Sequence, residues 1–311
     1  MTDLAPAVRT VVQRCLAVQP GENVVVVVDS PLQEVGQALR DEAERARADA
    51  VLVVMSPRGE HGEEPPAPIA EALAACDVFV APTTKSLSHT QARKRASERG
   101  ARGATMPTVT DDMLARLMAI DFDVMRARSQ AVAQLLDAAD TAHVTCPRGT
   151  DLTIELTGRE GLADDGDLTA PGAFGNLPCG EGFIAPLGGE GTVVAQSLAS
   201  LGLGEARLTL SGGQLTEAGG ELGEQLYERL TVHGEAGTNL AELGVGTNEN
   251  ATLTGNVLED EKILGTVHVA FGASAAIGGT VAVPVHLDVV ITDASLTIGD
   301  TTVLDGGRYV L

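Results

Sequence analysis

The first half of the chain alternates short apolar runs with amphipathic segments. Residues 23–29 (NVVVVVD) form a nearly continuous β-branched run, which is typical of a parallel strand buried on both faces. A Ser-Pro pair at 30–31 then opens a helical pattern. Strand and helix signals continue to alternate as far as a long helical stretch over 111–138. Residues 1–141 are therefore expected to form an α/β domain with a Rossmann-like layout.

The pattern changes near residue 142. Apolar and polar positions then alternate with period two, and glycine becomes frequent. Strands joined by turns are predicted over 144–157, 206–210, 230–233, 262–271, 280–292 and 294–311. We therefore expect residues 142–311 to form a β-rich domain, and its strands carry the candidate metal-binding residues.

The predicted strand over 280–292 places His286 and Asp288 on one face. Its odd-numbered positions from 281 to 291 are all aliphatic, whereas His286 and Asp288 have the other parity. Residues i and i+2 of a strand share a face. The pair therefore either makes a hydrogen bond on an exposed sheet face or supplies two metal ligands.

The predicted strand over 262–271 adds His268. A Gly-rich connection over 272–279 joins it to the next strand, and a hairpin would bring His268, His286 and Asp288 together. Those three side chains form a minimal site for a divalent metal.

Carboxylates upstream could complete the site. Glu181 lies in a Gly/Pro-punctuated segment (GNLPCGEGFIAP), and Glu242 lies in an apolar island (NLAELGVGTN) where an unpaired charge is costly to bury. Glu261 belongs to an acidic run over 259–261 that resembles a solvated turn. It is kept as a reserve ligand or as a neighbour of the ligands.

Composition excludes several other roles. The chain has 311 residues, a formal net charge of −22 and only 2% aromatic residues, which disfavours nucleic-acid and membrane-surface binding. It contains neither GxGxxG nor GxxxxGK[ST], the nucleotide-binding fingerprints. The four cysteines are widely spaced, and neither a signal peptide nor a membrane-spanning run is evident. A cytoplasmic protein is expected.

The segments GNLPCGEGF, NLAELGVGTN, EDEKILGTVHVAFG and VPVHLDVVI resemble, in this order, the metal-binding half of the aminopeptidase T and aminopeptidase S metallopeptidases. The resemblance is greatest to a shorter bacterial branch often labelled leucyl aminopeptidase. It is specific over residues 172–292, and it implies that two metals are held by Glu181, Glu242, His268, His286 and Asp288. At the position of the Tyr that these peptidases place seven residues after their first metal-binding His, this chain has Ala275.

The resemblance favours a metal-dependent aminopeptidase acting on leucyl-type peptides. Two divalent ions (Zn, Co, Mn or Mg) would activate a water, and Glu181 or Glu261 would accept its proton. The resemblance also implies a homodimer.

Two alternatives stay open. His268, His286 and Asp288 also satisfy the two-His-one-carboxylate triad of non-haem Fe(II) enzymes, and the same superfamily resembles dihydroxypyridine ring-cleaving dioxygenases. Such an enzyme would consume O₂ and need no second metal. The chain could also be a metal-stabilised scaffold without activity, an alternative that Ala275 keeps open.

Overall fold

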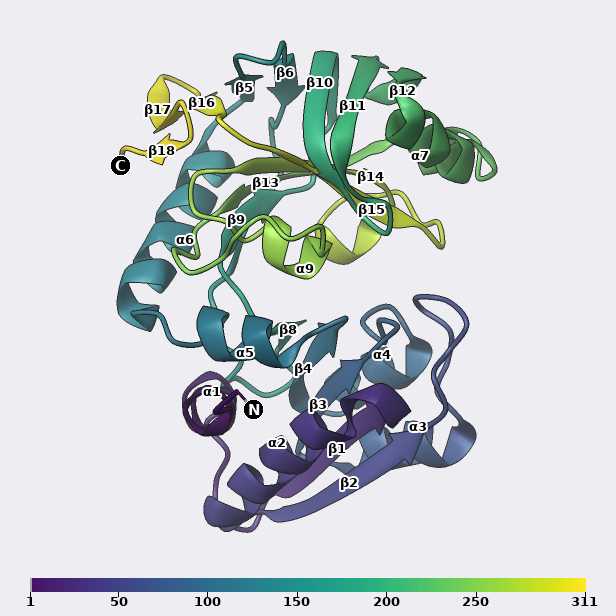
Figure 1. Cartoon of the computed structure of the whole chain (residues 1–311), viewed down its shortest axis with the longest axis vertical. Coiled ribbons are helices and arrows are strands. Elements are labelled where there is room, and N and C mark those ends of the chain that lie inside the picture. Colours follow the sequence, from purple (N-terminus) through teal and green to yellow (C-terminus); the bar gives the residue numbers. More distant parts are fainter. Residues whose placement is uncertain (1) are drawn as a thin grey trace. The chain divides into compact units, whose positions relative to one another are not determined.

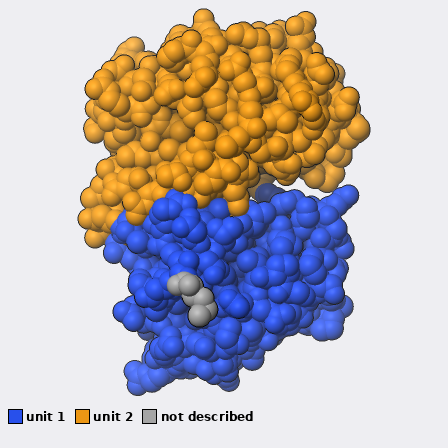
Figure 2. All heavy atoms as spheres, viewed as in Figure 1, with its two compact units in different colours: residues 1–120, 166–179 blue, residues 121–165, 180–311 orange. Residues whose placement is uncertain are grey.

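The structure, a computed structural model, describes residues 2–311 and divides into two compact units. Unit 1 comprises Met1–Ile120 and Gly166–Cys179, and unit 2 comprises Asp121–Asp165 and Gly180–Leu311 (Figure 2). The chain therefore passes between the units three times. This division differs from the single boundary expected near residue 141.

The difference arises from helix α6 (Phe122–Ala138), which packs against strands of unit 2. The sequence predicts one long helix over 111–138, but the structure has α5 (Asp111–Leu117) and α6 in its place. The side chain of Asp121 accepts hydrogen bonds from the backbone N–H groups of Asp123 and Val124, so it caps the start of α6. In the part of the chain that the structure describes, no helix is long and apolar enough to cross a membrane.

Unit 1 is built on a five-stranded parallel sheet with the order β2-β1-β3-β4-β8. The first two strands coincide with the predicted runs, and β1 is buried along almost its whole length. The valines of β1 pack with Phe79 and the helices of the unit to form an aliphatic core. The strands are β1 (Asn23–Asp29), β2 (Asp49–Met55), β3 (Val78–Thr83), β4 (Arg102–Pro107) and β8 (Phe174–Asn176). The α-helices are α1 (Ala5–Arg9), α2 (Gln33–Arg45), α3 (Ala67–Ala75), α4 (Gln91–Glu98) and α5 (Asp111–Leu117).

Unit 2 is built on a large antiparallel sheet (Figure 1). Its main path, as far as residues 2–311 show, runs β18-β17-β16-β5-β6-β10-β15-β14-β13-β9-β7, and β11 and β12 extend it from β10. The strands are β5 (Thr141–Thr145), β6 (Asp151–Glu155), β7 (Gly161–Asp164), β9 (Glu181–Ile184), β10 (Gly188–Leu198), β11 (Gly202–Ser211), β12 (Gln214–Gly219), β13 (Leu240–Gly246), β14 (Val267–Gly272), β15 (His286–Ile291), β16 (Ser295–Ile298), β17 (Thr301–Asp305) and β18 (Arg308–Tyr309). The α-helices, besides α6, are α7 (Glu221–Thr231), α8 (Glu235–Thr238) and α9 (Val257–Asp260).

The structure changes several predicted strands of unit 2. The one over 230–233 is wrong, because those residues end α7 and the turn after it. The one over 280–292 begins only at His286, because residues 273–285 form a loop with a short 3₁₀ turn. Likewise, β14 begins at Val267, after the turn at Gly265, whose φ is +93°. The period-two pattern therefore predicts the strand cores better than their ends.

The burial of Ile291 allows a test of the core of unit 2. Ile291 is fully buried in β15 and lies opposite Val267 of β14. We predict that Ile291→Ala lowers the free energy of unfolding by about 2–5 kcal/mol, because it leaves a cavity among packed aliphatic side chains. Urea denaturation measures this, with Val232→Ala as the control, since Val232 is 77% exposed. Equal effects of the two substitutions would contradict the assignment of Ile291 to the core.

Candidate metal centre

One face of five neighbouring strands carries the candidate site. The strands lie in the order β7-β9-β13-β14-β15. Residues that pair across antiparallel strands share a face. The pairs on this face are Asp164–Glu181, Glu181–Gly246, Gly244–His268, Glu242–Ala270, Ala270–Asp288 and Gly272–His286. Residues of opposite parity, among them Val267, Val269, Val289 and Ile291, pack into the core of unit 2. The alternation of polar and apolar residues thus places the candidate ligands on one face of the sheet and the core residues on the other.

Glu242 lies at the centre of the cluster. Its Oε1 is 3.4 Å from Nε2 of His268, and its Oε2 is 3.2 Å from Nε2 of His286. Two groups of possible metal ligands share it. Glu181, Glu242 and His268 form the first group, and Glu242, His286 and Asp288 form the second, with all ligand atoms of a group within 4.8 Å of one another. His268 therefore falls in a different group from His286 and Asp288.

The orientation of His286 suits a metal ligand. Its Nδ1 lies 2.7 Å from the carbonyl oxygen of Ala273, so Nδ1–H donates to that carbonyl and Nε2 is the ring nitrogen left to bind a proton or a metal ion. Nε2 then faces the carboxylates of Glu242 and Asp288, at 3.2 and 3.4 Å. Metal-bound histidines are commonly held by such a hydrogen bond from the other ring nitrogen.

Exposure differs across the cluster. The side chain of His268 is fully buried, whereas those of His286 and Asp288 are 21% and 13% exposed. A small molecule from solvent would therefore reach the cluster on the side of His286 and Asp288.

The pKa shifts of the two histidines and of Glu242 indicate that positive charge on the imidazoles stabilises the cluster. Burial would lower the pKa of His268, but Glu181 and Glu242 outweigh it and hold that pKa well above its usual range. Burial acts in the same direction on His286, whose pKa is raised by Asp288 and Glu242. Burial would raise the pKa of Glu242, yet hydrogen bonds with both histidines lower it below its usual range. Either a proton or a metal ion on each imidazole supplies this charge, so the donor set fits a metal.

Two glycines make room for the centre. A Cβ on Gly244 would lie 2.1 Å from Nε2 of His268, so only glycine lets that ring lie across β13. A Cβ on Gly246 would lie 2.1 Å from the carbonyl oxygen of Ile263, so this glycine lets the segment after α9 approach β13. The glycines of the motif NLAELGVGTN are therefore part of the site.

A buried lysine adjoins the cluster. Nζ of Lys262 lies 2.6 Å from Oε1 of Glu181, 2.8 Å from Oε1 of Glu261 and 3.5 Å from Oδ2 of Asp164. Burial would lower the pKa of Lys262, but Glu181, Glu261 and Asp164 together raise it well above its usual range. Burial also raises the pKa of Asp164 to about 7 and that of Glu261 to about 8, with Lys262 opposing both shifts.

The acidic run over 259–261 is not a solvated turn, contrary to the sequence-based interpretation. Glu259, Asp260 and Glu261 are all buried. Glu259 accepts hydrogen bonds from the backbone and hydroxyl of Thr252, and Asp260 accepts one from the hydroxyl of Ser197 at 2.6 Å. The first two acids therefore fix the loop before α9, while Glu261 turns toward Lys262.

The structure brings all the predicted site residues together. Glu181, Glu242, His268, His286 and Asp288 form the two ligand groups, and Glu261 lies beside them through Lys262. Their binding of metal stays a prediction. Sequence reasoning missed Lys262 and Asp164. The signal that could have revealed Lys262 is a lone lysine in an acidic run directly before a strand that carries a candidate ligand.

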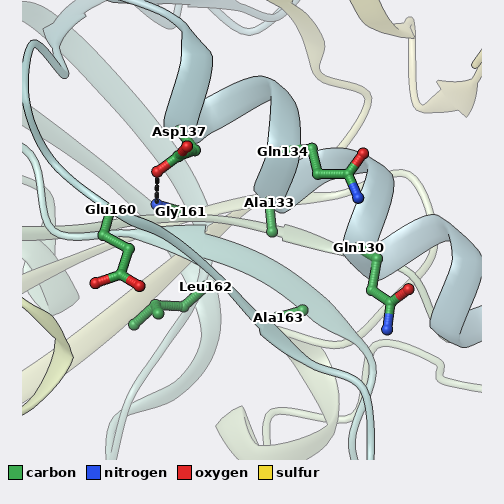
Figure 3. A pocket seen from close by; sticks show the side chains of 8 residues that line it. All are labelled: Gln130, Ala133, Gln134, Asp137, Glu160, Gly161, Leu162 and Ala163. Carbon is green, nitrogen blue, oxygen red and sulfur yellow. Dashed lines mark hydrogen bonds between the residues drawn. The ribbon is translucent and has the colours of Figure 1, made fainter.

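A pocket elsewhere in unit 2 does not belong to this centre. It lies between α6 and β7 (Figure 3). None of the candidate site residues lines it. Its lining side chains are Gln130, Ala133, Gln134, Asp137, Glu160, Gly161, Leu162 and Ala163.

The fold and the buried His-carboxylate cluster define a protein of two units, the second of which carries a candidate metal centre. The family model described as 2,5-dihydroxypyridine 5,6-dioxygenase matches residues 3–311, and the chain belongs to this family. No curated protein matches the chain.

Two solved structures share the fold. The 2,5-dihydroxypyridine dioxygenase from Pseudomonas putida KT2440 superposes with a TM-score of 0.83 at 20% identity, over 99% of this chain and 96% of that one. Wild-type AmpT from Thermus thermophilus superposes with a TM-score of 0.73 at 20% identity, over 99% of both chains. At such identities the likeness concerns the fold.

The family match overturns the leading functional prediction. A hydrolase, and with it an aminopeptidase or protease, is wrong for a chain that belongs to a dioxygenase family. The resemblance to aminopeptidase T reflects a shared fold, as the likeness to AmpT shows. The family implies a metal cofactor, in agreement with the predicted metal dependence. The homodimer stays a prediction.

Removing a ligand tests the centre directly. His286→Ala and Asp288→Ala are each expected to lower metal affinity by more than the roughly 10–100-fold that loss of an outer-shell partner costs. Titration of chelator-stripped protein with Fe(II) or Mn(II) measures it. The matched control is His143→Ala, because His143 forms an exposed pair with Asp151 at 2.8 Å in the same unit. Unchanged affinity in both site variants would show that the metal binds elsewhere.

The glycine beneath His268 gives a second test. Gly244→Ala is expected to displace the His268 ring and to weaken metal binding, because the new methyl group would overlap that ring. Gly219→Ala is the control, since a Cβ there would meet its nearest atom at 3.9 Å. Metal titration and thermal melting of both variants separate a local effect from unfolding. Wild-type affinity in Gly244→Ala would mean that His268 takes no part in binding.

Proposed function

We propose that this protein is a metal-dependent dioxygenase that opens the ring of a dihydroxylated pyridine. The observation that carries the proposal is the family match over residues 3–311. The buried cluster of histidines and carboxylates supports it, because imidazoles and carboxylates are the side chains with which non-haem iron enzymes hold their metal. If the protein acts as the name of its family says, the cleaved bond would be the one between C5 and C6 of the ring.

The sequence predicts a triad of His268, His286 and Asp288, whereas the structure groups Glu242 with His286 and Asp288, with their ligand atoms within 4.8 Å of one another. Glu242, His286 and Asp288 would therefore hold the metal, and Glu242 also contacts Nε2 of His268. A redox-active ion such as Fe(II) would supply the one-electron steps that the reaction of O₂ with a closed-shell ring requires. The hydrogen bond from His286 to Ala273 fixes the tautomer in which Nε2 is free to bind. Burial of His268 holds its ring in one place, and the partial exposure of His286 and Asp288 leaves the approach for a ring substrate.

Ring hydroxyl groups must lose protons to become electron-rich enough to react with O₂, and the sequence predicts Glu181 and Glu261 as proton acceptors. Glu181 is the better placed of the two. Lys262 binds its Oε1, and its Oε2 lies 3.2 Å from Nε2 of His268 within the cluster. Burial raises the pKa of Glu261 to about 8, which favours the protonated form near neutral pH. We therefore assign proton acceptance to Oε2 of Glu181.

The substrate ring would meet few aromatic side chains. The chain has five Phe, two Tyr and no Trp; Phe271 of β14 belongs to the core side of the sheet, and Phe183 of β9, which pairs with Gly244, is on the face of the candidate site. Recognition would instead depend on polar contacts to the ring hydroxyls and nitrogen. This favours a small, hydroxylated heterocycle over a large apolar aromatic compound.

Oxygen uptake tests the function. Protein loaded anaerobically with Fe(II) is expected to consume one O₂ for each 2,5-dihydroxypyridine and to abolish the ultraviolet absorption of the ring. With ¹⁸O₂, both labelled atoms should enter the product, as a dioxygenase requires. Asp288→Asn should lower the rate at least 100-fold, while His143→Ala should keep it.

Two other outcomes decide against the proposal. Hydrolysis of leucyl anilide without O₂ uptake would restore the peptidase. A loaded protein with intact metal and no turnover of this or any related dihydroxylated ring would favour the non-catalytic scaffold.

A further inference from the structure

The ammonium group of Lys262 lies in a position that resembles a cation site. Three carboxylate oxygens surround it, from Glu181, Glu261 and Asp164, at 2.6, 2.8 and 3.5 Å. The Lys262 side chain is only 1% exposed, and those of the three acids are 9–11% exposed. Oxygen-rich surroundings of this kind are what hard divalent cations prefer.

The sheet creates this anionic position. Asp164 of β7 and Glu181 of β9 are directly opposite each other in the register. Like charges in such a pair repel, and burial strengthens the repulsion because no water screens it. Among the described residues, Oδ2 of Asp164 has no hydrogen-bond partner, and Nζ of Lys262 lies 3.5 Å from it. Protonation of one acid or a cation between them would relieve this repulsion, and the ammonium group of Lys262 is the cation that the chain provides.

The backbone presents Lys262 to the acids in a fixed way. The N–H of Asn248 donates to the carbonyl of Lys262 at 2.9 Å, and the N–H of Leu264 donates to the carbonyl of Asn248 at 3.0 Å. Gly246, which faces Glu181 across the sheet, leaves room for the segment to pass at contact distance. Lys262 thus lies in a short segment that two backbone hydrogen bonds hold against Asn248.

We propose that Lys262 is a built-in monovalent cation, which fills a position that a divalent ion would otherwise take. By binding Oε1 of Glu181, it leaves only Oε2 of that residue toward His268, and its charge repels a metal from the space between the three acids. Lys262 is therefore a positioning residue that limits the number of metal ions in the centre. The inference rests on the proposed function only in that the centre binds a metal.

Metal stoichiometry tests the proposal without any turnover. Chelator-stripped wild type and Lys262→Met are dialysed to equilibrium against Mn²⁺, and the metal per chain is measured by elemental analysis. Lys262→Met is expected to hold one more Mn²⁺ per chain than the wild type. Lys94→Met is the matched control, because it removes the same charge from α4 in unit 1 and should bind as the wild type does.

Equal stoichiometry in folded Lys262→Met and wild type would overturn the proposal. So would an equal gain in Lys94→Met, since the extra ion would then reflect net charge alone. Thermal melting with and without Mn²⁺ gives a second readout, because an added bound ion raises the melting temperature of Lys262→Met more than that of the wild type.

A second variant decides the case even if Lys262→Met does not fold. Glu261→Gln keeps Lys262 and its pair with Glu181, so the metal count should equal that of the wild type. Loss of one Mn²⁺ per chain would show that Glu261 is itself a metal ligand and would overturn the proposal. These measurements use neither O₂ nor a ring substrate. Their outcome can therefore be interpreted even if the protein has no dioxygenase activity.

Discussion

The centre of this protein depends on an imbalance of charge on one buried sheet face. Five carboxylates gather there with one ammonium group and two imidazoles. The carboxylates belong to Asp164, Glu181, Glu242, Glu261 and Asp288. Water cannot reach most of them, so their repulsion must be met by protons, by Lys262 or by metal ions. A metal ion bound here would thus help to stabilise this arrangement of side chains, besides any part it takes in chemistry.

The strand parity that builds this face could be predicted from the sequence. The alternation around His286 and Asp288, and again around His268, places those side chains opposite the aliphatic core side, as the register of β14 and β15 shows. The first strand of unit 1 could be predicted equally well, since the β-branched run over 23–29 matches β1 residue for residue. A local sequence pattern is enough to predict a strand and the direction of its side chains when one or both faces of that strand are buried.

Other features depend on contacts between distant segments. Lys262 and Asp164 become neighbours only because β7 pairs with β9 and the segment after α9 crosses β13. The acidic run at 259–261 looks solvated in isolation, and its burial follows from partners at Thr252 and Ser197. The identity of the reaction is harder still to predict. Histidines and carboxylates can serve metal-dependent hydrolysis as well as ring opening, so the motifs predicted the fold but the wrong chemistry, and the metal-binding residues stay a prediction.

Residues 166–179 belong to unit 1 but interrupt the sequence of unit 2, and this affects how the molecule can be divided. These residues leave unit 2 after Asp165, add β8 to the parallel sheet of unit 1 and return at Gly180. The N–H of Gly180 donates to the carbonyl of Asp164 at 3.0 Å, so the two ends of the excursion meet. Fusing Asp165 to Gly180 by a tight turn would therefore make unit 2 a continuous polypeptide with its metal ligands intact. The unit that carries the candidate metal centre is, in this sense, a module that a gene could encode by itself.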